Sequence, residues 1–201
     1  MSRSTTPAAG APDGAGPPRR QRSDAKRSAA ALLDAAKTAF AQSGVDVPAK
    51  QITDLAGVGV GTLYRHYPRR SDLIVAVLQH EIDECVTAAD ELSSGAGPRA
   101  ALVAWIGRFT EFVGTKQGLA SALHSGDPAY EGLPDQLLEQ LVPALQGLLD
   151  RAAAAGEARD DVSAREVLTA IALLSQPVPG GADGFSERMI AIFLDGLSVT
   201  G

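Results

Sequence analysis

Apolar residues recur at helical spacing along most of the chain, and glycines and prolines stand where the pattern stops. The strict alternation that half-buried strands show is absent. The spacing predicts helices at about 24–42, 50–56, 61–67, 71–92, 99–116, 119–124, 135–155, 163–175 and 184–198. Aromatic residues are few, whereas sheets favour aromatic and β-branched residues. The expected fold class is therefore all-α.

The first 21 residues follow a different pattern. They are rich in proline, glycine, alanine and serine, and such a composition does not bury enough apolar surface to order a chain. We therefore expect 1–21 to be a disordered arm, and Arg19, Arg20 and Arg22 make its end basic. Two interpretations stay open: the arm contacts phosphates or the minor groove of DNA, or it is a solvated basic tail.

Two short helices joined by a tight turn are predicted after the first long helix. The first of them, 50–56, places Ile52, Leu55 and Ala56 at i, i+3 and i+4, so these side chains form one apolar face. Gly57 follows, and glycine readily adopts the left-handed conformation that ends many helices. The pattern indicates a sharp turn into the second helix.

The second helix, 61–67, carries Leu63 and Tyr67 as an inward pair, and Pro68 ends it. Its outer face presents Thr62, Arg65 and His66, and Tyr64 lies at the border of this face. Hydroxyl, imidazole and guanidinium groups hydrogen-bond to phosphates and base edges, so this face suits the major groove of DNA. After the proline, Ser71 is expected to cap the next helix.

The string from Ala56 to Tyr67, A-G-V-G-V-G-T-L-Y-R-H-Y, resembles the most recognisable motif of the TetR (tetracycline-repressor-like) family, A-G-V-x-x-G-T-[LV]-Y-x-[HY]-[FY]. With the flanking helices, the resemblance covers about 24–80. It implies a three-helix helix-turn-helix DNA-binding domain at 22–70. It also implies a C-terminal helical-bundle domain at 71–201 for ligand binding and dimerisation.

The resemblance further implies which residues meet DNA. Base contacts are implied near Lys50, Val60, Gly61 and Tyr64, and phosphate contacts near Thr62, Arg65, His66 and Arg70. The chain departs from the family pattern at Val47-Pro48, where a hydroxyl residue is usual, and at Gly59-Val60, where serine and a polar residue are usual. Direct readout is therefore expected to lean on methyl contacts.

The formal net charge of −6 is unevenly divided. Residues 1–70 hold eleven Lys and Arg against five Asp and Glu, whereas 71–201 hold seven against nineteen. A basic N-terminal third attracts a polyanion, and an acidic remainder is repelled by it. This distribution favours a nucleic-acid partner and a defined docking orientation.

Trp105, Phe109 and Phe112 form an aromatic stripe on one predicted helix. The stripe is either ordinary core packing or the lining of an effector cavity, since ligand pockets are mostly apolar. Arg108 flanks it and is a candidate partner for a ligand carboxylate. Alternatively, Arg108 forms a surface pair with Glu111 at i+3.

The segment from His124 to Pro134 contains two glycines and two prolines, which forbid a helix there. It is either a lid or a plain connection. The last two predicted helices are apolar over a wide arc. The family resemblance implies a two-fold homodimer through a four-helix bundle built from them, and the alternative is a bundle within one chain.

No catalytic or metal-binding signature is found. Cys85 is the single cysteine, and His66, His80 and His124 lie too far apart in sequence for metal-ligand spacing. There is no G-x-S-x-G elbow, phosphate-binding glycine loop or H-E-x-x-H motif. The chain also lacks a signal-peptide pattern and a membrane-length apolar run. We expect a cytoplasmic protein that is not an enzyme and needs no cofactor or metal.

Together these observations predict a dimeric transcriptional regulator that binds double-stranded DNA. It is expected to be a repressor that a small-molecule effector releases from a pseudo-palindromic operator. The main rival is a ligand-binding or scaffold protein whose DNA-reading head is weak or vestigial. A helical-bundle enzyme is a further alternative, although the sequence shows no convergent polar groups for one.

Overall fold

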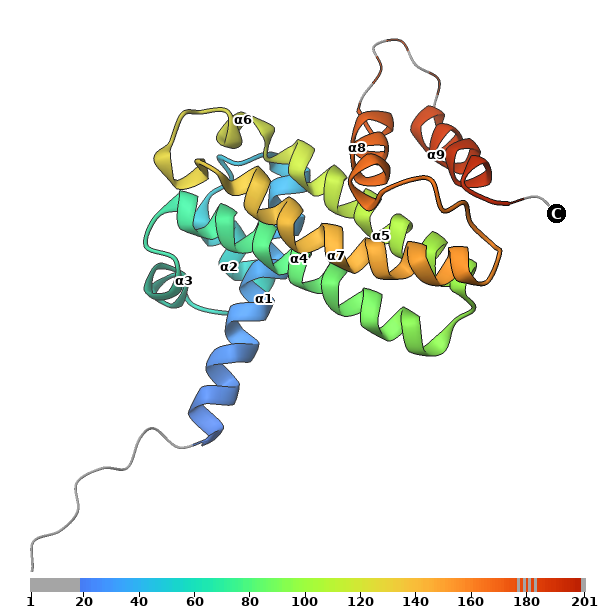
Figure 1. Ribbon diagram of the computed structural model, residues 1–201. Coiled ribbons are helices and arrows are strands. Elements are labelled where there is room, and N and C mark those ends of the chain that lie inside the picture. The colour runs from blue at the N-terminus through green and yellow to red at the C-terminus, as the bar shows by residue number, and fades with distance from the viewer. Residues whose placement is uncertain (1–18, 177, 179, 181, 183, 200–201) are drawn as a thin grey trace, which may run out of the picture.

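The computed structural model describes residues 19–176, 178, 180, 182 and 184–199, and this part of the chain is helical without strands. Its elements are α1 (Arg19–Ser43), α2 (Ala49–Ala56), α3 (Val60–His66), α4 (Arg70–Gly95), α5 (Pro98–Gly118), α6 (Ala120–Leu123), the 3-10 helix η1 (Pro128–Tyr130), α7 (Leu133–Ala154), α8 (Ala164–Leu174) and α9 (Phe185–Gly196). The all-α fold class is confirmed. In Figure 1, α1–α3 lie toward one end of α4, and α8 and α9 stand as a pair beside the α4–α5–α7 bundle.

Helix α1 begins at Arg19, five residues before the predicted start at Asp24. Residues 19–21 of the predicted arm are therefore helical, because arginine and glutamine are good helix formers and the last proline of the arm precedes them. The rest of the predicted arm, 1–18, lies outside the described residues.

Helix α4 begins one residue before Ser71, so Ser71 is not its cap as predicted. Asp72 stabilises this end instead, since its carboxylate accepts from the Arg69 backbone N–H at 3.0 Å and from the Arg69 guanidinium at 2.7 Å. These bonds hold the pKa of the Asp72 carboxyl below its usual range. Ser71 is buried in the first turn.

Helix α4 is the shared support of the two halves, because α1, α5, α7 and η1 all pack against it. Its apolar side includes Ile74, Leu78 and Ile82, each 1% exposed or less. The Trp105 indole N–H of α5 donates to the Cys85 carbonyl of α4 at 2.7 Å. An ion pair of 2.6 Å between Lys37 of α1 and the buried Glu81 of α4 ties the N-terminal helices to the same support.

The predicted helix-free segment between α6 and α7 is more ordered than its prolines and glycines indicated. Asp127 accepts from the Ala129 N–H at 2.9 Å and starts η1, which packs Tyr130 against α4. Helix α7 begins at Leu133 with Pro134 in its first turn, where proline is tolerated because the N–H there has no partner within the helix. None of the helices found in the described residues is both long enough and apolar enough to cross a membrane.

Candidate nucleic-acid interface and ligand cavity

The turn between α2 and α3 depends on Gly57, which has a φ of 67°. From this left-handed position the Val58 N–H bonds back to the Thr53 carbonyl at 3.1 Å, which closes the end of α2. Gly59, extended at φ −79° and ψ 149°, then starts α3. The predicted helix-turn-helix is thus present with its glycine at the predicted turn.

The buried face of α2 differs from the predicted one. Ile52 is buried as expected, but Leu55 is 54% exposed and Thr53 is 1% exposed. Thr53 tolerates burial because its hydroxyl donates to the Lys50 carbonyl at 3.0 Å, which leaves its methyl group to pack. Three apolar residues on an eight-residue helix do not determine which way the helix is rotated.

The predicted inner face of α3 agrees with the structure. Leu63 is 3% exposed, and burial of the Tyr67 ring raises the pKa of its hydroxyl. These two side chains fix α3 against the domain. The opposite side of the helix is therefore turned outward.

Six predicted DNA-contact residues lie on α3: Val60, Gly61, Thr62, Tyr64, Arg65 and His66. Tyr64 is 53% exposed and Val60 is 38% exposed, which leaves both an aromatic and a methyl-bearing surface open. Arg65 and His66 are exposed in the last turn, and Thr62 is half-buried. This face combines hydrogen-bonding, cationic and apolar groups on one short helix, the combination that reads a major groove.

The two remaining predicted contacts, Lys50 and Arg70, have partners within the protein. Lys50 of α2 is exposed, and its ammonium lies 2.7 Å and 2.9 Å from the two Asp54 carboxylate oxygens. An exposed pair of this kind is weak, so the Lys50 side chain remains free to exchange Asp54 for another anion.

Arg70 turns its guanidinium toward the interior of the domain. Its guanidinium donates to the Val45 carbonyl at 2.7 Å and to the Val47 carbonyl, and its centre lies 5.1 Å from the centroid of the Phe40 ring. Burial lowers the pKa of this guanidinium. Arg70 therefore holds α4 to the connection between α1 and α2.

A cavity of about 530 Å³ lies between α5, α6, α7 and α8. Its walls are mostly apolar: Phe109, Phe112, Val113, Leu123, Leu137, Leu138, Leu141, Leu168, Ala172 and Leu173. Polar side chains complete the lining: Lys116, Gln117, His124, Asp135, Thr169 and Gln176. A volume and composition of this kind are typical of small-molecule sites.

The aromatic stripe is divided between the core and this cavity. Phe109 and Phe112 line the cavity, whereas Trp105 is fully buried behind Phe109 with the rings stacked at 5.8 Å. Arg108 is not in the lining, and it pairs with Glu84 of α4 at 3.2 Å rather than with Glu111. The sequence could not indicate Glu84, because that residue lies on another helix.

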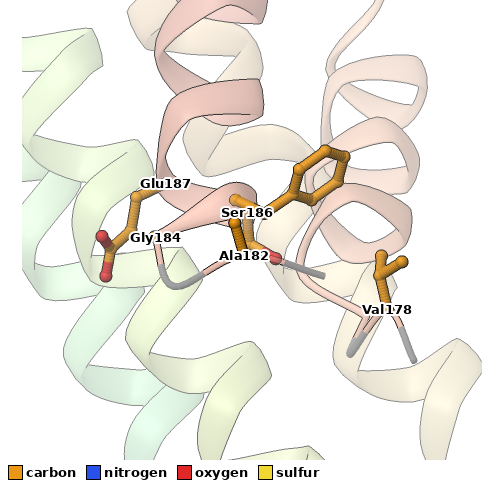
Figure 2. A pocket seen from close by; sticks show the side chains of 6 residues that line it. Val178, Ala182, Gly184, Ser186 and Glu187 are labelled. Carbon is orange, nitrogen blue, oxygen red and sulfur yellow. The ribbon is translucent and has the colours of Figure 1, made fainter. Parts of the chain in front are cut away.

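A smaller pocket of about 180 Å³ lies where α9 begins. It is lined by Val178, Ala182, Gly184, Phe185, Ser186 and Glu187. Figure 2 shows the Glu187 carboxylate and the Val178 side chain on opposite sides of the pocket, so the lining side chains do not converge on a ligand. The pocket is also below the usual size of a small-molecule site.

Helices α8 and α9 expose large apolar side chains. Leu173 of α8 is 67% exposed and Ile192 of α9 is 62% exposed. Each helix buries only part of its predicted apolar arc within the chain.

Among the described residues, no group of three or more His, Cys, Asp or Glu side chains is arranged to hold a metal ion.

Two family models match the chain. The one described as bacterial regulatory proteins, tetR family, matches residues 32–77, and the one described as transcriptional regulator SbtR-like, C-terminal domain, matches residues 97–199. HTH-type transcriptional regulators of Staphylococcus aureus are 36% identical over 67 residues, which cover 33% of this chain and 36% of the regulator of strain USA300. The match thus spans about a third of the length of these curated relatives.

Solved structures match nearly the whole chain. The TetR transcriptional regulator SCO0520 of Streptomyces coelicolor is 36% identical, with a TM-score of 0.72 over 86% of this chain and 99% of that one. The TetR transcription regulatory protein of Mycobacterium vanbaalenii is 32% identical, with a TM-score of 0.73 over 89% of this chain and 99% of that one. The likeness therefore includes both the α2–α3 unit and the helical bundle that holds the cavity.

Proposed function

Because the chain belongs to the TetR family of transcriptional regulators, we propose that it is a dimeric repressor that a small-molecule effector releases from a pseudo-palindromic operator. The outer face of α3 carries this proposal. It offers Tyr64, Arg65 and His66 to solvent on a short helix whose other side is fixed by Leu63. No internal packing role explains these three exposed side chains.

In the proposed complex, α3 enters the major groove. Arg65, His66 and Thr62 bind phosphates, while Tyr64 and Val60 meet base edges and thymine methyl groups. Lys50 leaves Asp54 for the DNA. Arg70 has a supporting role, because its hydrogen bonds to the α1–α2 connection hold the reading helices in place.

The dimer is proposed to form through α8 and α9. Their exposed Leu173 and Ile192 would be buried in a four-helix bundle with the same helices of a second copy. A two-fold dimer would place two α3 helices in successive major grooves, about 34–36 Å apart. The effector is proposed to bind the cavity between α5, α7 and α8 and to favour a dimer with a different spacing, to the extent that its affinity differs between the two shapes.

The decisive experiment is fluorescence anisotropy of the full chain on DNA from its own upstream region, with unrelated DNA alongside and salt varied. We expect tight binding to its own DNA, weak binding to unrelated DNA and a steep salt dependence. Tyr64→Ala should weaken specific binding, whereas Val103→Ala, on α5, should not. Equal and weak binding to both DNAs would contradict the proposal and favour the rival with a vestigial reading head.

A further inference from the structure

The cavity between α5, α6, α7 and α8 has two chemically different ends. Along α5 the lining begins at Phe109, continues through Phe112 and Val113, and ends at Lys116 and Gln117. These residues follow one helical stripe that changes from apolar to polar. The wall that α5 contributes is therefore apolar at one end and polar at the other.

The walls that α7 and α8 contribute also change from apolar to polar toward the same end. The Gln117 amide donates to the Ser175 carbonyl at 2.7 Å, which joins the C-terminal ends of α5 and α8. The chain returns through α6 and η1, so α7 begins beside the end of α5 (Figure 1). The polar end therefore gathers Lys116, Gln117, His124, Asp135 and Gln176, and the apolar end gathers Phe109, Leu141 and Leu168.

Most polar groups at the polar end are already bonded within the protein. His124 Nδ1 lies 2.7 Å from the Ala120 carbonyl, and the Gln176 amide donates to the Ala172 carbonyl at 3.0 Å. Among the residues that the structure describes, the side chains of Lys116 and Asp135 have no hydrogen-bond or ion-pair partner. A ligand head group is therefore expected to meet one of these two charges.

The ammonium is the better partner for a ligand. The Lys116 side chain is half-buried in the cavity wall and has no counter-ion among the described residues, so an anionic head group would form a charge-assisted hydrogen bond with it. Asp135 is exposed and lies in the first turn of α7, where water and the helix N-terminus stabilise its carboxylate. The lining also contains the His124 imidazole, and Asp135 is its single carboxylate.

We propose that the cavity binds an amphipathic organic acid, with its carboxylate at Lys116 and its hydrocarbon tail between Phe109, Leu141 and Leu168. Lys116 lies seven positions after Phe109 on α5, a rise of about 10 Å, which suits a medium-length tail. The role of this acid as the effector rests on the proposed function. Its binding does not.

Isothermal titration calorimetry of the full chain without DNA tests the ligand class. The probes are decanoate and decylammonium, each below its micelle concentration, and decanol below its solubility limit. Decanoate is expected to bind about tenfold more tightly than decanol, because only the acid forms a charge-assisted hydrogen bond. Lys116→Met, which keeps an apolar stem, should abolish this preference, and Asp135→Asn should retain it.

The apolar end is tested by Leu168→Phe, which shortens the space for a tail. This variant should weaken decanoate binding more than hexanoate binding. Circular dichroism melts of all variants establish that they fold. Equal affinity for decanoate and decanol, a preference for decylammonium, or no binding of any probe by the folded protein would overturn the proposal.

The two proposals fail in different ways. Decanoate that binds through Lys116 but leaves the operator complex intact supports the ligand class and contradicts ligand-controlled release. Operator release by a cationic or neutral ligand whose affinity is unchanged in Lys116→Met supports ligand-controlled release. The same result contradicts the proposal that the effector is an organic acid bound at Lys116.

Discussion

Arg70 directs its guanidinium into the domain rather than toward solvent. From the sequence it is one of two arginines after Pro68, and its position beside the reading helix favours a phosphate contact. The carbonyls that it binds belong to Val45 and Val47, more than twenty residues earlier. Such a long-range partner is not indicated by local spacing, whereas helical periodicity correctly predicts that Arg65 and His66 lie on the exposed face of α3.

Replacing Arg70 by alanine is expected to lower the free energy of unfolding by about 1–3 kcal/mol, because two partly buried carbonyls lose their donor. Urea denaturation followed by circular dichroism measures the change. Arg65→Ala is the matched control, and it should change stability by less than about 0.5 kcal/mol while weakening DNA binding. An Arg70→Ala protein as stable as the wild type would show that the carbonyl contacts contribute nothing.

The Cys85 thiol is expected to be unreactive in the folded protein. Burial raises its pKa to about 11, and the side chain is 1% exposed. At about pH 8 almost none of it is the reactive thiolate, so a disulfide reagent such as DTNB should label it only slowly. The same protein in urea should react at once, and rapid labelling of the folded protein would contradict this environment.

At the scale of elements, the positions of the helices are predictable and their ends and rotations are less so. Glycine and proline breaks placed the α2–α3 turn and the connections around α5 correctly. The cap of α4 was predicted at Ser71, but the carboxylate of Asp72 supplies it through the Arg69 backbone. The rotation of α2 was wrong because its few apolar residues also permit the orientation that buries Thr53.

Gly57→Ala is expected to cost about 1–2 kcal/mol of stability, because an L residue is strained at its φ of 67°. No atom lies within 4 Å of the added Cβ, so the cost is confined to the backbone. Gly59→Ser is the matched control, since its conformation is ordinary and serine is a good N-cap for α3. Thermal unfolding should rank Gly59→Ser at or above the wild type, and two equally unstable variants would contradict the backbone argument.

At the scale of the whole molecule, the division into a basic reading unit and an acidic bundle was visible in the charges. Only part of the cavity lining could be predicted from the sequence. Phe109 and Phe112 were identified as candidates, but Leu141 and Leu168 come from other helices and meet them only in the fold. Arg108 is a candidate for the same site from its place beside the stripe, although the fold pairs it with Glu84.

Leu173→Glu together with Ile192→Glu is expected to give a monomer, because a dimer through α8 and α9 would bury four unpaired carboxylates. Sedimentation velocity measures the mass. Val103→Glu introduces one glutamate per chain at a 39% exposed apolar residue of α5 and should leave the dimer intact. A double variant that remains dimeric would place the interface elsewhere.

Trp105 is the chain's single tryptophan, and its indole gives the protein an intrinsic fluorescent reporter. It is shielded from water, anchored to the Cys85 carbonyl and stacked at 5.8 Å on Phe109, whose ring forms part of the cavity wall. A molecule entering the cavity is thus separated from the fluorophore by one aromatic ring. Emission wavelength and quenching should therefore register events in the bundle without any attached dye, and the reading helices, which contain no tryptophan, add no background.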